Sequence, residues 1–100
     1  MMSDFYDRDG QPLTLDEWAA VMEDRDYRRV ALTEVGGASV STVWLGSDHN
    51  WSDDKGPPII FETMIFGGPH DDFCERYSTE GQARAGHCSV VRALRDGVDP

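Results

Sequence analysis

The sequence has few of the residues on which several classes of small protein depend. It contains two cysteines, Cys74 and Cys88, in 100 residues. Two cysteines are too few for a disulfide framework, so reduced thiols are expected. No apolar run approaches the roughly 18 residues of a membrane-spanning helix, and the first residues lack the basic and apolar regions of a signal peptide. The sequence therefore predicts a cytoplasmic protein with no membrane partner.

Positive charge is also scarce. Nine Lys and Arg residues stand against 19 Asp and Glu residues, so the formal net charge is −10. Binding to nucleic acid requires Lys and Arg that neutralise phosphates, so direct nucleic-acid binding is not expected. Before residue 27, two arginines accompany eight acidic residues: Asp4, Asp7, Asp9, Asp16, Glu17, Glu23, Asp24 and Asp26. A basic partner would meet this end first, although such charge also serves simply to keep a small protein soluble.

The remaining composition is that of a folded chain. Hydrophobic residues make up 39% of the sequence and aromatic residues 10%, which is too apolar for a disordered protein. One hundred residues are too few for two independent cores. We expect one domain over residues 1–100.

The N-terminal quarter predicts a hairpin followed by a helix. Asp9-Gly10 favours a tight turn within residues 5–13. Thr14 and Glu17 match a capping box, and Leu15, Trp18 and Met22 recur at helical spacing. The pattern predicts a helix from about residue 15 to residue 24 with a strongly acidic outer face.

The rest of the chain predicts four strands and a second helix. The expected strands are residues 28–35, 38–45, 59–66 and 73–77, with Gly36-Gly37 as the first turn. Thr79 and Gln82 form a second capping box, and Gly97 suits the end of that helix. The fold class is therefore α+β: an antiparallel meander of about four strands with two helices packed on one face.

The longest connection between strands, residues 46–58, is a candidate interaction loop. Its candidate residues are Asp48, His49, Asn50 and Trp51. The spacing of its first acidic and polar residues imitates a calcium loop, but Asp53 and Ile59 occupy positions that need Gly and Glu. Trp51 is either an exposed anchor or a lid on the sheet.

Four polar residues form a candidate cluster: His49, Glu62, Tyr77 and His87. Glu62 alternates with Ile60, Met64 and Phe66, and His87 lies in the apolar stripe of the last helix. If the two surfaces pack together, a hydrogen bond between Glu62 and His87 would satisfy both and raise the pKa of the histidine. We expect His87 to contact Glu62 or Tyr77 rather than His49. Such a pair serves either structure or acid–base chemistry.

No cofactor or metal is predicted. A zinc site would need His70, Cys74, His87 and Cys88, but the close cysteine pair of strong zinc motifs is missing. The chain also lacks a Gly-x-Ser-x-Gly elbow and a glycine-rich phosphate loop. No catalytic residue is assigned.

Several segments together resemble a family of small proteins encoded by bacteriophages and prophages, especially those of actinobacteria. The similarity covers most of the chain and is carried by residues 5–10, 43–50, 57–64 and 76–87, with Trp-Leu-Gly-x-Asp-His-Asn and Phe-Glu-Thr-Met as its most specific blocks. Ser47 departs from the pattern, since a larger apolar residue is usual there. The family has no assigned activity, so the resemblance implies a phage product acting in the bacterial cytoplasm and identifies no catalytic residue.

The leading hypothesis is an acidic phage accessory protein that binds another protein, either a host factor or a second copy of itself. One alternative is a small metal-dependent or acid–base hydrolase using Asp48, His49, Glu62 and His87. Another is an inhibitor whose acidic N-terminal half imitates DNA.

Overall fold

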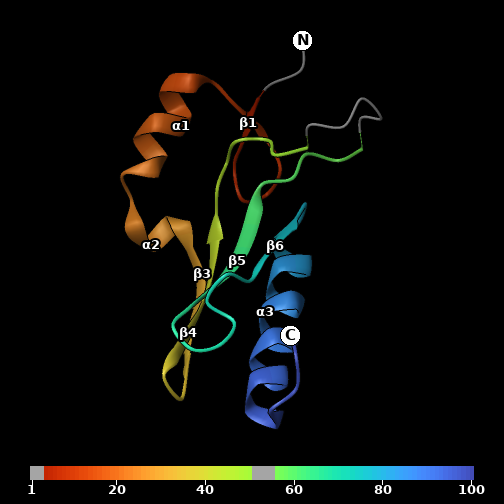
Figure 1. Ribbon diagram of the computed structural model, residues 1–100. Coiled ribbons are helices and arrows are strands. Elements are labelled where there is room, and N and C mark those ends of the chain that lie inside the picture. Colours follow the sequence, from red (N-terminus) through yellow and green to blue (C-terminus); the bar gives the residue numbers. More distant parts are fainter. Residues whose placement is uncertain (1–3, 51–55) are drawn as a thin grey trace.

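The structure is a computed structural model that describes residues 4–50 and 56–100 (Figure 1). The molecule is elongated, with principal extents of 46, 31 and 20 Å. Its elements are, in chain order, β1 (Phe5–Tyr6), β2 (Pro12–Leu13), α1 (Leu15–Met22), α2 (Arg25–Arg28), β3 (Arg29–Val35), β4 (Ala38–Trp44), β5 (Phe61–Phe66), β6 (Cys74–Tyr77) and α3 (Glu80–Asp96).

The centre of the fold is a four-stranded antiparallel sheet in the order β3-β4-β5-β6. Each strand pairs with its neighbour in the chain, so the predicted meander and the α+β class are confirmed. Gly36, with a φ of 58°, forms the turn between β3 and β4, as the Gly-Gly pair predicted. Thr42 is opposite Thr63, and Phe61 is opposite Tyr77.

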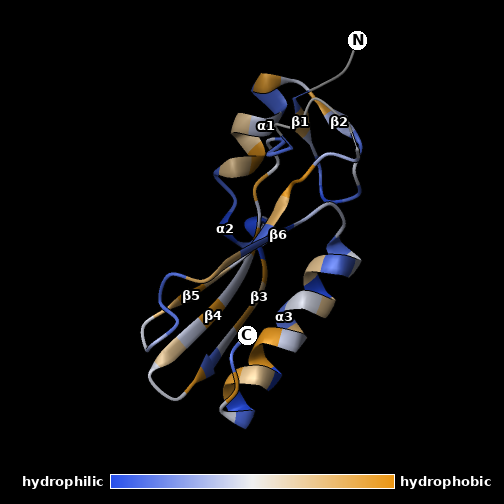
Figure 2. Cartoon of the chain, turned by 45° about the vertical axis from the view of Figure 1, so that its right-hand side comes forward, coloured by the Kyte–Doolittle hydropathy of each residue, from blue (hydrophilic) through white to orange (hydrophobic). Residues whose placement is uncertain are grey.

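Helix α3 covers one face of this sheet (Figure 2). Thr79 and Gln82 form the predicted capping box, and Gly97 ends the helix in the left-handed conformation. Ala83, Val90 and Val91 are buried, which confirms the predicted apolar stripe. None of the helices in the described parts of the chain is long and apolar enough to cross a membrane.

Helix α1 lies against the β1–β2 hairpin and α2, beyond one end of the sheet (Figure 1). Its predicted capping box is present at Thr14 and Glu17. The helix reaches the core through Trp18, which stacks on Phe5 with ring centroids 4.6 Å apart and donates a hydrogen bond to the Leu45 carbonyl. We expected both helices on one face of the sheet; α3 takes that position, and α1 closes the end of the core instead.

The core consists of two clusters along the covered face of the sheet. One contains Trp44, Phe61 and Tyr77 and is completed by side chains of α1 and the hairpin. The other contains Val40 and Ile65 and is completed by α3. Gly46 is essential to the first cluster, because its φ is 76° and a Cβ atom there would lie 2.5 Å from the rings of Trp18 and Trp44.

Candidate functional site

His87 is the centre of a buried hydrogen-bond network. Its side chain projects from α3 onto the covered face of the sheet, and the residue is 5% exposed. Its Nε2 lies 2.8 Å from the Thr33 hydroxyl and its Nδ1 lies 2.8 Å from the Thr42 hydroxyl. Thr42 is hydrogen-bonded in turn to Thr63 on the next strand. Both ring nitrogens of His87 are therefore occupied by threonine hydroxyls.

Glu62 lies on the opposite face of the sheet from His87, so the predicted hydrogen bond between them does not form. Side chains alternate along a strand, and it is Phe61, Thr63 and Ile65 that face α3. Glu62 instead accepts a 2.9 Å hydrogen bond from Arg76 and a weaker one from the Cys74 thiol. The condition for that hydrogen bond, packing of α3 on the Glu62 face, is therefore not met.

The environment of His87 also reverses the expected pKa shift. Without a carboxylate partner, burial is the largest effect on the imidazole and lowers its pKa, and the positive charge of Arg84 acts in the same direction. A neutral histidine has one donor and one acceptor nitrogen, which two threonine hydroxyls can satisfy. The geometry is that of a neutral structural histidine.

Tyr77 does share the covered face with His87. Its ring packs directly against the backbone of Gly86, where an added Cβ would collide with it. The Tyr77 hydroxyl is buried near the side chain of Thr63, but it forms no hydrogen bond within the described residues. Burial raises the pKa of Tyr77, so the phenol stays protonated near neutral pH.

The described part of the loop shows Asp48, His49 and Asn50 in local contacts. Asp48 accepts hydrogen bonds from the backbone amides of Asn50 and Ile59, which ties the two ends of the loop together. His49 Nδ1 is 2.9 Å from the Ser47 carbonyl. Asn50 donates to the Pro57 carbonyl. Trp51 lies outside the described residues, as does Asp53 of the imitated calcium loop.

The four residues of the hydrolase alternative are thus not assembled into one site. Asp48 fastens a loop, Glu62 faces away from α3, and His87 is enclosed by threonines. The zinc candidates are dispersed as well: His70 faces Asp99, whereas Cys74 contacts Glu62. In residues 4–50 and 56–100, no three His, Cys, Asp or Glu side chains are placed to hold one metal ion.

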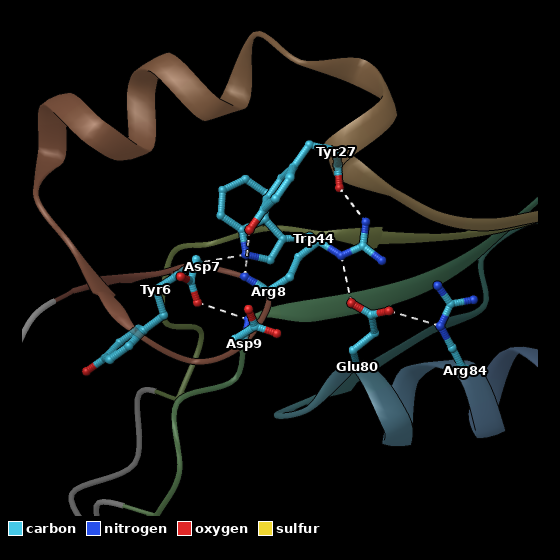
Figure 3. Close-up of polar contacts among 8 residues, drawn as sticks. All are labelled: Tyr6, Asp7, Arg8, Asp9, Tyr27, Trp44, Glu80 and Arg84. Atoms are coloured by element: carbon cyan, nitrogen blue, oxygen red, sulfur yellow. Dashed lines mark hydrogen bonds and ion pairs between the residues drawn. The ribbon is translucent and has the colours of Figure 1, made fainter.

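A second polar cluster, centred on Arg8, joins three distant segments (Figure 3). Arg8 donates a 2.7 Å hydrogen bond to Glu80 at the start of α3 and a 3.0 Å hydrogen bond to the Tyr27 carbonyl in α2. Glu80 also accepts from Arg84. The hydrogen bond from Arg8 is the largest cause of a lowered pKa at Glu80. We call this group the Arg8 clasp, and its contacts serve to hold the hairpin on the body of the protein.

The sheet face opposite α3 is a surface that the sequence interpretation missed. No helix covers this face in the described parts of the chain, and we call it the outer face. Strand register places eleven side chains on it: Arg29, Leu32, Glu34, Ser39, Ser41, Val43, Glu62, Met64, Phe66, Cys74 and Arg76. Leu32 and Phe66 are 46% and 52% exposed. The face therefore combines two exposed large apolar side chains with serines and four charged residues, Arg29, Glu34, Glu62 and Arg76.

At one end of the outer face, where α2 approaches β3 and β4, there is an open pocket of about 440 Å³. Three arginines line it: Arg25, Arg28 and Arg29. The other lining residues are Met22, Ser41, Val43, Trp44 and Leu45. We call this the arginine pocket. Its signal in the sequence is Arg-Asp-Tyr-Arg-Arg, the densest group of positive charge in the chain.

The chain matches no protein-family model, no curated protein and no solved structure.

Proposed function

We propose that this is a small acidic bacteriophage accessory protein that acts by binding another protein through its outer face. The observation that carries the proposal is the uncovered four-stranded sheet face with Leu32 and Phe66 exposed. Large exposed apolar side chains grouped on one surface are typical of interaction sites. The resemblance to phage proteins supports the biological setting.

The chemistry of the outer face suits protein contact more than catalysis. Leu32 and Met64 lie in one row across the strands, and Phe66 lies in the next row. Cys74 belongs to the same row as Leu32, and burial together with the Glu62 carboxylate raises the pKa of its thiol. The thiol is therefore predominantly neutral near neutral pH, and it adds to the apolar surface.

The size and charge of this surface define the partner. The outer face consists of four short strands of four to seven residues, whereas stable interfaces bury about 800 Å² of accessible surface per partner. A stable partner must therefore extend to the neighbouring arginine pocket. Together, the side chains of the outer face and the lining of the arginine pocket include four arginines and two glutamates, Glu34 and Glu62, although the whole chain is strongly acidic. The surface fits a protein with an apolar patch beside acidic groups.

A second copy of the chain is a weaker candidate for the same face. Two copies that meet through the outer face and the neighbouring arginine pocket would bring together surfaces that each carry four arginines and two glutamates, and the two acidic molecules would also repel each other. We therefore assign the surface to a different protein, namely a host factor.

The test is affinity capture from an actinobacterial host lysate with matched variants. Replacing Leu32 and Phe66 by Ser removes the exposed apolar side chains of the outer face. The control replaces Leu15 and Val98 by Ser, because these two are 59% and 56% exposed but lie in α1 and beyond α3. We expect the wild type and the control to retain the same protein and the L32S/F66S variant to lose it.

Other outcomes redirect or overturn the proposal. Equal capture by L32S/F66S would overturn the outer face as the binding surface. Added DNA would abolish capture by a DNA mimic, and removal of the charges of Asp16 and Glu17 would weaken it. These two results together would instead favour DNA mimicry by the acidic end. Sedimentation of the purified protein as a dimer that L32S/F66S dissociates would assign the face to a second copy. Failure to enrich any protein over a charge-matched control would reject protein binding.

A further inference from the structure

We infer that the arginine pocket binds a phosphate monoester. This site is distinct in chemistry from the apolar part of the outer face, and its occupation requires no partner protein. The inference stands on the composition of the pocket, on one buried donor without a partner, and on the charge of the rest of the chain.

The pocket gathers positive charge without any acidic residue in its lining. Arg25 and Arg29 are exposed, and Arg28 is half-buried between them. Within the described residues, no carboxylate lies within ion-pair distance of any of the three. By contrast, Arg8, Arg76 and Arg84 are all paired with carboxylates. Three unpaired guanidinium groups around one hollow are the arrangement that recognises phosphate.

Glu23, Asp24 and Asp26 are near the pocket arginines in the sequence but form no ion pair with them, and two carboxylates close to the pocket are engaged elsewhere. Asp24 caps α2 by accepting from the backbone amides of Asp26 and Tyr27. Glu62, beside Val43 on the outer face, is bound by Arg76. Asp24 and Glu62 therefore do not bind the guanidinium groups of the pocket directly.

Arg28 supplies the second observation. Its Nε is buried, and it has no hydrogen-bond acceptor among the described residues. Buried donors in proteins nearly always have an acceptor, and a bound oxyanion would provide one. Ser41 adds a hydroxyl to the lining, and hydroxyls complement guanidinium groups in holding phosphate oxygens.

The shape and the apolar part of the lining indicate a group larger than a free ion. Met22, Val43 and Leu45 line the pocket beside the arginines, and its volume of about 440 Å³ exceeds that of one phosphate. Small-molecule sites are commonly 300–1,000 Å³ and combine apolar walls with a few charged groups. A phosphate attached to an organic group uses both parts of the pocket.

The charge of the whole chain makes such binding selective. At a net charge of −10 the protein repels anions at long range. Anions that bind this chain must therefore be held by a local group of cations rather than by general attraction. The same ligand chemistry has two sources, a free phosphorylated small molecule and a phosphorylated side chain of the partner.

The test is a titration of the purified full chain in which NMR spectra are recorded at each step. The ionic strength is kept constant, and chloride is the reference anion. The probes are inorganic phosphate, adenosine monophosphate and a short phosphoserine peptide. We expect the Nε–H signal of Arg28 and the amide signals around Ser41 to shift on titration. A small-molecule site would bind the mononucleotide most tightly, and a site for a modified protein would bind the phosphopeptide most tightly.

Matched variants decide the interpretation. R25Q/R29Q replaces two exposed side chains, so folding is retained, and its dissociation constant should rise at least about tenfold because charge-assisted hydrogen bonds are lost. R92Q/R95Q removes the same charge from α3 and should leave the affinity within about twofold. Equal weakening by both variants, or shifts located at α3, would overturn the site. Because L32S/F66S keeps all three arginines, it should still bind phosphate even if partner capture fails.

Discussion

Replacement of the central histidine of the threonine network, His87→Gln, should destabilise the fold without unfolding it. The residue is 5% exposed and holds hydroxyls from two strands, each at 2.8 Å. Glutamine can maintain at most one of these contacts. Loss of a hydrogen bond that leaves a buried group unsatisfied costs about 1–3 kcal/mol. We expect a loss of about 2–3 kcal/mol, which lowers the Tm of a domain of this size by about 10–20 °C.

The same substitution should change how stability depends on pH. The pKa of His87 is lowered in the folded state, so protonation favours the unfolded chain. The stabilisation from the neutral histidine is complete above the unfolded-state pKa of about 6.5 and is lost as pH falls below that value. Over this range the free energy of unfolding falls by at most about 1.4 kcal/mol per pH unit. The difference in stability between wild type and His87→Gln should therefore be smaller at pH 5.5 than at pH 7.5.

Urea unfolding followed by tryptophan fluorescence at the two pH values measures both effects. His70→Gln is the control, because its contact with the nearly fully exposed Asp99 is worth little, and its stability at pH 7.5 should lie within about 0.5 kcal/mol of wild type. A His87→Gln protein as stable as wild type would refute the structural role of the network. A stability difference that stays constant between the two pH values would refute the neutral, buried state of the histidine.

Three other predictions concern packing, capping and charge. Gly86→Ala should lower stability by about 1–3 kcal/mol in thermal unfolding, because the new methyl group would collide with the ring of Tyr77; an unchanged Tm would contradict this packing. Thr79→Ala should cost about 1 kcal/mol through loss of the α3 cap, whereas Thr79→Ser should retain most of the stability. Wild-type stability should decline as pH falls below about 4.5, because Arg8 lowers the pKa of Glu80 in the folded state. Glu80→Gln should make that decline shallower in an acid titration monitored by circular dichroism. An identical decline in both proteins would argue against the ion pair.

The elements of the fold were predictable because their signals are local. Both capping boxes, the Gly-Gly turn and Gly97 at the end of α3 depend on residues within a few positions of each other. Helix α2 was not predicted, since Arg-Asp-Tyr-Arg is too short to show an apolar period. The position of α1 at the end of the sheet depends on the contact of Trp18 with Leu45, which no local pattern specifies.

The site was harder to predict, because strand β5 is apolar on both faces. Met64 and Phe66 alternate with Phe61 and Ile65, so periodicity shows which residues share a face without showing which face α3 covers. The burial of His87 was predicted from its place in the apolar stripe, but its partners depend on strand register. Thr42 and Thr63 alternate with buried apolar residues, and that alternation is the signal that could have placed them opposite His87.

The Arg8 clasp gives the fold a particular order of assembly. Arg8 and Glu80 are 72 positions apart in the chain, so during synthesis the arginine is made long before the carboxylate that it binds. The hairpin that carries Arg8 cannot complete its attachment until α3 exists, although the β3–β4 hairpin can pair as soon as both strands are made. The β1–β2 hairpin is therefore translated before α3 but reaches its final position only after α3 has been made.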